Sequence, residues 1–248
     1  MNKYIGVTGF RVRHEIEEIS NFAKQLPTTC RVHYGVMTGR KKLSDLATKY
    51  SHSFLSYEAL DSIFPEANEQ TMNCVHYADY GEKVDSETTM LHLGKVCFYT
   101  KNIQAIQLDM VLPPVTAVNP ILKMFPNIEL ILQINPETLA AKTTKELKDY
   151  LQTFYRLDWI LFDQSKGTGK KGDAEQMQRF LDEFSEYNVV LAGGLGPETL
   201  NVLGSLQGKT SIDAQGKLTR IGEDEFNPYL DLTKVKTYLS LAAQVYET

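Results

Sequence analysis

Short apolar runs alternate with amphipathic stretches along the whole chain, and this alternation limits the possible folds more than any other sequence feature. Two runs are hydrophobic almost without interruption, IELILQI at 128–134 and WILFD at 159–163. Strands that are buried on both faces of a parallel sheet have this composition. The alternation predicts eight strands, at Lys3–Gly9, Arg31–Thr38, Cys74–Tyr80, Ile103–Met110, Ile128–Asn135, Trp159–Asp163, Val189–Gly194 and Thr210–Ala214.

Helical patterns occupy most of the segments between these strands. Residues 145–155, 175–187 and 233–245 have apolar side chains at helical spacing. The segments 50–73 and 88–99 fit least well, because the first holds only two weak helical pieces and the second is poorly amphipathic. The clearest stripe lies in residues 14–26 and consists of Ile16, Ile19, Phe22, Ala23 and Leu26.

Eight strands that alternate with helices fit either a closed barrel or a doubly wound open sheet. A nucleotide-binding open sheet usually carries a glycine-rich turn after its first strand, and Gly6-Val7-Thr8-Gly9-Phe10 does not match that fingerprint. The glycines gather instead after the last three expected strands, where barrels commonly bind phosphate. The length of 248 residues also suits a barrel. The sequence therefore predicts an α/β fold, with a single (β/α)8 TIM barrel domain over 1–248.

Composition and charge argue against several classes of protein. The formal net charge of −5 is unsuited to a surface dedicated to nucleic acid or to an anionic membrane. There is no uninterrupted apolar run of about 18 residues and no apolar N-terminal run typical of a signal peptide. The cysteines, Cys30, Cys74 and Cys97, lack CxxC spacing. We expect a cytoplasmic monomer or homodimer with no cofactor, metal, nucleic-acid partner or membrane partner.

The strongest local signal is an aspartate that ends a strand and is followed by a loop of glycines and lysines. Asp163 ends the sixth expected strand, and Gly167, Thr168 and Gly169 lie in the loop after it. Small residues let backbone N–H groups approach an anion, and barrel strands end at the rim where catalytic groups meet the ligand. The alternative is an exposed loop with solvated charges.

Two similar endings follow. The seventh strand runs into Gly193 and Gly194, and Pro197 is expected to open a helix whose N-terminus favours an anion. An ordinary tight turn is the alternative. The eighth strand contains Asp213 and is followed by Gly216. Three such endings in succession predict a site for a small phosphorylated metabolite.

These three segments resemble phosphoribosylanthranilate isomerase, the (β/α)8 enzyme of tryptophan biosynthesis. The resemblance rests on FDQSKGTGKKGD at 162–173, LAGGLGPETL at 191–200 and SIDAQGKL at 211–218. It is weaker in the first half, where KYIGVT, TGR and QLD look like the family's KICGIT, SPR and QLHG. The resemblance implies a phosphate site and an Amadori rearrangement, an intramolecular aldose–ketose isomerisation.

The resemblance also assigns roles to residues. Asp163 takes the place of the family's general acid, and Arg40 would hold a substrate carboxylate. Ile5 stands where the family has its general-base cysteine, and an isoleucine side chain cannot take a proton. Asp109 replaces the histidine of QLHG and points to the same side of its strand as Gln107, so it is the candidate substitute base. Otherwise, Asp109 only bonds a loop and Arg40 is a solvated surface charge.

Two histidines near strand ends, His33 and His76, invite a metal interpretation. Residues three apart on a strand face opposite sides, so His76 and Asp79 are not expected to converge. Packed, hydrogen-bonded histidines are the favoured interpretation.

Three functions remain open. The first is an isomerase of phosphoribosylanthranilate type, or a relative that acts on another aminated or phosphorylated sugar. The second is a phosphosugar lyase or aldolase that uses Asp109, Asp163 and Asp213 as acid and base groups. The third is a non-catalytic relative that only binds a phosphorylated ligand. Ile5 favours the third function, whereas Asp163 and the glycine-rich loops favour the first two.

Overall fold

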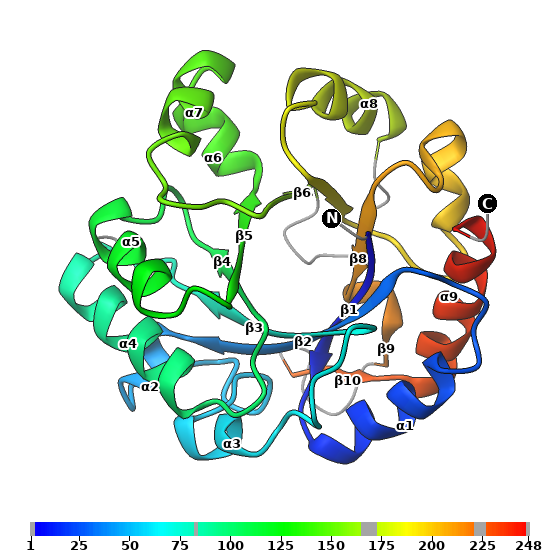
Figure 1. The fold of residues 1–248 in the computed structure, drawn as a ribbon, viewed down its shortest axis with the longest axis horizontal. Coiled ribbons are helices and arrows are strands. Elements are labelled where there is room, and N and C mark those ends of the chain that lie inside the picture. The colour runs from blue at the N-terminus through cyan, green and yellow to red at the C-terminus, as the bar shows by residue number, and fades with distance from the viewer. Residues whose placement is uncertain (1–2, 82–83, 165–172, 221–226, 247–248) are drawn as a thin grey trace.

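The computed structural model describes residues 3–81, 84–164, 173–220 and 227–246. Eight parallel strands form a closed barrel, and helices surround it (Figure 1). β1 pairs with β2 on one side and with β8 on the other, which closes the sheet. The predicted (β/α)8 TIM barrel is therefore confirmed. Its strands are β1 (Tyr4–Phe10), β2 (Arg31–Gly39), β3 (Thr71–Ala78), β4 (Ala105–Asp109), β5 (Glu129–Ile134), β6 (Trp159–Asp163), β7 (Val189–Ala192) and β8 (Ser211–Ala214).

The helices occupy the connections between the strands, and a two-stranded antiparallel ribbon lies before the last of them. Within the described ranges, none of the helices is long and apolar enough to cross a membrane. The elements are α1 (Arg13–Ala23), α2 (Arg40–Leu43), α3 (Tyr57–Asp61), α4 (Ser86–Tyr99), α5 (Val115–Met124), α6 (Pro136–Ala141), α7 (Thr144–Leu151), α8 (Ala174–Glu183), η1 (Leu200–Leu206), η2 (Gly216–Leu218), β9 (Thr219–Arg220), β10 (Tyr229–Leu230) and α9 (Leu232–Val245).

Polar side chains fix the points at which many of these helices begin. An N-cap oxygen accepts hydrogen bonds from backbone N–H groups of the first turn, which otherwise have no partner. α7 has the full reciprocal arrangement, because Glu146 also bonds back to its cap residue. The cap residues are Asp85 for α4, Asn135 for α6, Thr143 for α7, Asp173 for α8 and Asp231 for α9.

Three connections depart from a regular amphipathic helix. The segment 50–73 contains only the short α3, consistent with its weak periodicity. α4 is regular, but it looks poorly amphipathic because Leu91 and Phe98 lie on its exposed face. The expectation that Pro197 opens a helix is wrong. A turn follows β7, and the 3-10 segment η1 begins only at Leu200.

Alternate residues of each strand face either the barrel interior or the surrounding helices. Tyr4 faces the interior, where its ring packs edge-on against Trp159 of β6. The next residue, Ile5, is fully buried in the outer cluster that also contains Ile16 and Ile19 of α1. The interior cluster consists of Tyr4, Met72, Cys74, Ala105, Ile131, Trp159, Leu161, Val190 and Ala192.

The N-terminal end of the barrel contains an ion pair that links non-adjacent strands. The Arg31 guanidinium of β2 reaches Glu129 of β5 with Nη1–Oε1 and Nη2–Oε2 distances of 2.5 and 2.9 Å. Trp159 Nε1 of β6 donates to Glu129 Oε2 at 2.7 Å. Burial raises the pKa of Glu129, but the bonds from Arg31 and Trp159 outweigh it and hold that pKa below its ordinary value.

Glu129→Gln should therefore destabilise the barrel. The exchange leaves the largely buried Arg31 guanidinium without its counter-charge, and we expect the free energy of unfolding to fall by about 2–4 kcal/mol. Urea unfolding measures this change. Asp149→Asn, which breaks the exposed Lys145–Asp149 pair, should leave the unfolding free energy nearly unchanged. Equal effects of the two exchanges would contradict the role assigned to the Glu129 contacts.

Candidate active site

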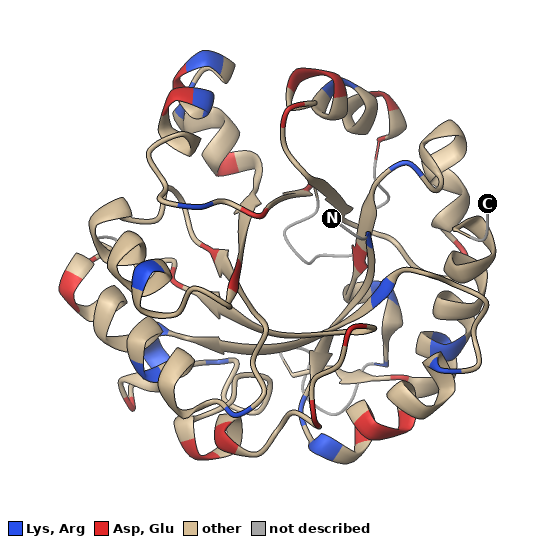
Figure 2. Cartoon of the chain, viewed as in Figure 1, with Lys and Arg blue, Asp and Glu red and all other residues tan. Residues whose placement is uncertain are grey.

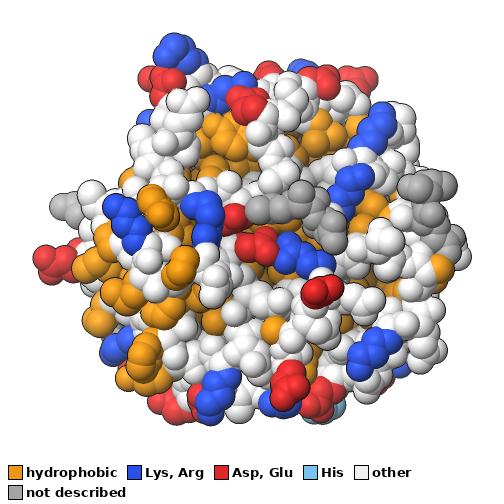
Figure 3. Space-filling model, in the orientation of Figure 1, with side chains coloured by type: hydrophobic (Ala, Val, Ile, Leu, Met, Phe, Trp, Pro, Cys, Tyr) orange, Lys and Arg blue, Asp and Glu red, His pale blue; other side chains and the backbone are white. Residues whose placement is uncertain are grey.

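A cavity of about 950 Å³, which we term the mouth cavity, opens at the C-terminal end of the barrel. Acidic residues occur on the central strands as well as on the outer helices (Figure 2). Figure 3 shows acidic and basic side chains together near the centre of the face that it presents. The structure brings most of the expected site residues to this cavity, namely Arg40, Asp109, Asp163, Gly193, Gly194, Asp213 and Gly216. Gly167, Thr168 and Gly169 lie outside the described residues.

A chain of hydrogen bonds crosses the mouth cavity from β6 to β3. Gln133 Nε2 donates to Asp163 Oδ2 at 3.2 Å, and Gln107 Nε2 donates to Gln133 Oε1 at 2.8 Å. Gln107 Nε2 also lies 3.4 Å from His76 Nδ1. His76 Nε2 in turn lies 3.3 Å from Asp109 Oδ2. The two carboxylates are thus connected through two amides and one imidazole.

The other oxygen of Asp109 is held by a tyrosine. The Tyr80 hydroxyl donates to Asp109 Oδ1, and Asn135 Nδ2 donates to the same hydroxyl at 3.3 Å. Burial and the neighbouring Asp109 carboxylate raise the pKa of Tyr80 well above its ordinary value. Tyr80, in the loop after β3, is therefore a neutral donor to Asp109 at physiological pH.

Asp213 sits deeper, against the inner side of β1 and β2. Thr8 Oγ1 lies 3.1 Å from Asp213 Oδ2, and His33 Nδ1 lies 3.8 Å from Asp213 Oδ1. Burial raises the pKa of Asp213 to about 7, with a smaller contribution from Asp163. Burial, helped by nearby His76 and Arg31, lowers the pKa of His33 to about 3, so this histidine is neutral.

The glycines after β7 have backbone conformations that other residues rarely adopt. Gly193 and Gly194 have φ angles of 95° and 71°. Thr199 Oγ1 donates to the Gly194 carbonyl oxygen at 2.6 Å and fixes this turn. Because no helix begins at Pro197, the expected helix N-terminus does not follow β7, whereas Gly193, Gly194 and Gly216 do border the mouth cavity.

The structure also places the remaining candidate residues. Arg40 lines the mouth cavity at the start of α2, and its Nη1 lies 3.9 Å from Oδ2 of buried Asp79. His76 and Asp79 both line the mouth cavity, where His76 lies beside Asp109 and Asp79 lies beside Arg40. His33, however, is packed without a hydrogen bond to either ring nitrogen, and His76 lines the mouth cavity. Both histidines are buried, as expected, and His76 bonds Gln107; only the expected hydrogen bond of His33 is wrong among the described residues.

Ile5 does not reach the mouth cavity. Its side chain faces the helices, whereas the neighbouring Gly6 faces the interior, where an added Cβ would lie 2.4 Å from Asp213 Oδ1. A cysteine at position 5 would have its thiol in the outer layer. The similarity of KYIGVT to KICGIT therefore does not place a base of the mouth cavity at position 5.

His76, Gln133 and Tyr80 were not among the residues singled out from sequence as part of the site. The sequence signal for such residues is a polar side chain inside an otherwise apolar strand, as Gln133 is in IELILQI. Such a residue on the inward-facing positions of a parallel barrel must find polar partners in the interior. That signal identifies the residue but not the partner.

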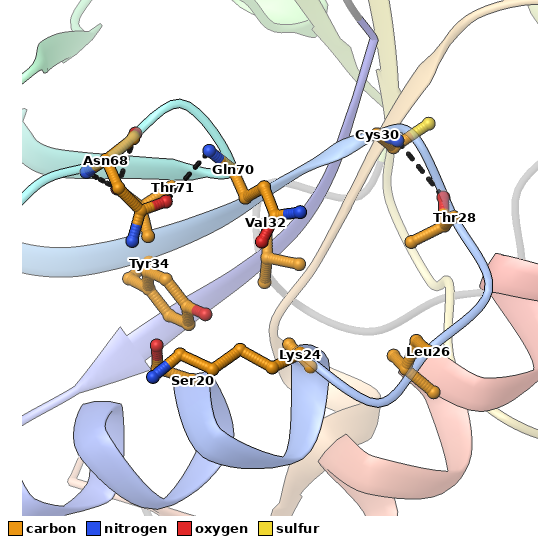
Figure 4. Close-up of a pocket in the computed structure, with 11 residues that line it drawn as sticks. Ser20, Lys24, Leu26, Thr28, Cys30, Val32, Tyr34, Asn68, Gln70 and Thr71 are labelled. Atoms are coloured by element: carbon orange, nitrogen blue, oxygen red, sulfur yellow. Dashed lines mark hydrogen bonds between the residues drawn. The ribbon is translucent and has the colours of Figure 1, made fainter.

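A second, much smaller cavity of about 40 Å³ lies at the opposite end of the barrel, between α1 and the starts of β2 and β3 (Figure 4). Its polar groups largely bond one another. Gln70 N donates to Asn68 Oδ1 at 2.8 Å, and Cys30 N donates to Thr28 Oγ1 at 3.1 Å. The cavity has room for water but not for a metabolite, so the mouth cavity is the candidate active site.

Comparison with known proteins gives likeness in structure only. No protein-family model and no curated protein sequence matches the chain. Phosphoribosyl anthranilate isomerase from Thermus thermophilus shares 16% identity at a TM-score of 0.62, over 98% of this chain and 99% of that one. N-(5'-phosphoribosyl)anthranilate isomerase from Pyrococcus furiosus shares 14% at 0.62, with the same coverage. Tryptophan synthase subunit alpha from Legionella pneumophila shares 9% at 0.61, over 99% and 93%.

The raised pKa of Asp213 makes the stability of the barrel depend on pH. A carboxyl whose pKa is higher in the folded than in the unfolded state stabilises the fold below its unfolded pKa, and this contribution is lost as pH rises through about 7. Asp213→Asn keeps an acceptor for Thr8 but cannot ionise. We therefore compare the free energy of unfolding of Asp213→Asn with that of the native chain. This difference should favour the variant by about 3–4 kcal/mol more at pH 8 than at pH 4. Denaturant unfolding at both pH values measures this, and a pH-independent difference would contradict it.

Proposed function

We propose that this chain binds a phosphorylated sugar in the mouth cavity and isomerises it in an Amadori-type rearrangement, as a divergent relative of phosphoribosylanthranilate isomerase. The observation that carries the proposal is the convergence of Asp109, Asp163 and Asp213 on one cavity bordered by Gly193 and Gly194. The proposal includes a role in tryptophan biosynthesis and a cytoplasmic location. The resemblance of the strand endings supports it.

The reaction requires one group that protonates the sugar ring oxygen, so that the ring opens, and another that removes the proton from C2, the carbon next to the anomeric carbon. We assign the first role to Asp163 and the second to Asp109. β1 offers no base, because Ile5 faces the helices, Gly6 has no side chain and the Thr8 hydroxyl bonds Asp213. Asp109 lies at the end of β4, where the Tyr80 hydroxyl bonds one carboxylate oxygen and His76 Nε2 lies 3.3 Å from the other, so its orientation is suited to proton abstraction.

The glycine backbones suit the phosphate end of the substrate. Glycine lets the chain approach an anion closely, and Gly193, Gly194 and Gly216 all border the mouth cavity. We assign Gly167 and Thr168 to the same phosphate site on the resemblance. Gly169 and Asp213 complete the proposed set, and Arg40 would hold a carboxylate of the substrate.

One observation favours a second function. Asp213, with a pKa of about 7, exchanges protons readily near neutral pH, and a third acid–base group suits a phosphosugar lyase or aldolase. In that reaction a carbon–carbon or carbon–nitrogen bond of the sugar breaks. In the isomerisation, the carbonyl group moves from one sugar carbon to the next. Product analysis separates the two reactions.

Ligand binding is the first test of the proposal. Phosphorylated ribose and aminodeoxyribulose compounds should raise the melting temperature, whereas the same sugars without phosphate should not. Gly194→Asn should abolish the shift, because its side chain occupies the space that the anion needs. Gly204→Asn is the matched control, since Gly204 also has a positive φ but has open space around its Cβ position. Retained binding by Gly194→Asn would place the anion elsewhere.

Turnover of phosphoribosylanthranilate is the second test. If Asp109 and Asp163 are base and acid, Asp109→Asn and Asp163→Asn should each lower kcat by about 10²–10⁴-fold, with little change in ligand affinity. Steady-state kinetics and binding titrations measure the two effects separately. Ligand binding by the native chain without any turnover would instead indicate a non-catalytic binding protein.

A further inference from the structure

We infer that His76 is a positioning residue for the candidate base Asp109: its ring presents the Nδ1 lone pair to Gln107, carries its proton on Nε2, and is turned toward Asp109 by Gln107. This inference deepens the proposed function, because Asp109 is a base only if that proposal holds. The orientation of the ring, however, follows from the hydrogen bonds of the protein alone.

The donor-to-acceptor direction of the hydrogen bonds from Asp163 to His76 is set at Asp163. A carboxyl oxygen without a proton only accepts, so the group that faces Asp163 Oδ2 at 3.2 Å is the amide nitrogen of Gln133. The amide oxygen of Gln133 must then face Gln107, and it accepts from Gln107 Nε2 at 2.8 Å. In this direction Gln107 Nε2 has two partners, while Gln107 Oε1 is buried without one in the described part of the chain. If Asp163 carries a proton to donate, that proton is on Oδ1, away from Gln133.

The same nitrogen of Gln107 settles which atom of His76 is protonated. An amide NH2 group has two hydrogens, and the second points toward His76 Nδ1, 3.4 Å away. Nδ1 must therefore present a lone pair. In a neutral imidazole the proton then lies on Nε2, the atom 3.3 Å from Asp109 Oδ2.

The surroundings of Nε2 favour this arrangement. The atom is buried and makes no hydrogen bond within the described part of the chain, and Asp109 Oδ2, 3.3 Å away, is the acceptor that a proton on it can reach. An Nε2 lone pair would instead place two acceptors against each other out of contact with water, which is costly. The Tyr80 hydroxyl bonds Asp109 Oδ1, and His76 Nε2 lies beside Asp109 Oδ2. The carboxylate keeps one orientation toward the mouth cavity.

The tautomer can be measured without any ligand. Long-range proton–nitrogen NMR correlations at alkaline pH distinguish a protonated from an unprotonated ring nitrogen. The His76 signals are those that disappear in His76→Gln. The native protein should show the Nε2–H form, and an Nδ1–H form would overturn the inference.

Changes at Gln107 test its part in the arrangement. Gln107→Met removes the donor at nearly constant volume and should lower the ratio of Nε2–H to Nδ1–H at least about fivefold, the effect of one lost hydrogen bond. Gln107→Glu should lower it further, because a carboxylate accepts from Nδ1–H. Gln215→Glu is the matched control, since it adds the same charge within the mouth cavity. The native Gln215 amide bonds Met37 Sδ and takes no part in the hydrogen bonds between Asp163 and His76. An equal shift in Gln215→Glu would overturn the role of Gln107.

Kinetics separate this inference from the proposed function. His76→Gln should lower kcat, and adding it to Asp109→Asn should cost little more, because both changes act on one group. Additive losses would overturn a role of His76 through Asp109. The expected tautomer without binding of any phosphorylated sugar would sink the proposed function while leaving the orientation of His76 established.

Discussion

The pairing of β1 with both β2 and β8 is the constraint on which the site depends. Closure of the sheet gives every strand residue one of two directions, toward the interior or toward the helices. Polar residues that would be unremarkable on an open face are thereby forced to meet. Gln107 and Gln133 come from neighbouring strands, and their buried amides bond each other at the wall of the mouth cavity.

Much of the fold follows from the sequence because apolar periodicity is a local property. The runs around β5 and β6 and the stripe of α1 each predict an element without knowledge of the rest of the chain. Pro197 misleads for the same local reason: it is a good first residue for a helix, yet the chain after β7 forms a turn that Thr199 fixes through the Gly194 carbonyl oxygen. Tertiary context decides such short connections.

The site is only partly predictable, because chemistry can be assigned to a strand residue only when it is known whether its side chain faces the interior or the helices. Asp163 and Asp213 stand out as acids in apolar strands, and both border the mouth cavity. Ile5 shows the limit, since similarity of letters to KICGIT says nothing about which way its side chain points. His76 was underestimated because its partners, Gln107 and Asp109, lie on the next strand and far away in sequence.

The two amides between Asp163 and His76 block proton transfer as well as supporting the side chains on either side of them. A carboxamide donates and accepts hydrogen bonds but neither gains nor loses a proton near neutral pH. Protons therefore cannot pass along Gln133 and Gln107 from one carboxyl to the other. Asp163 and Asp109 are therefore independent acid–base groups in one cavity. Each must regain or release its proton through the bound molecule or through solvent before the next cycle begins.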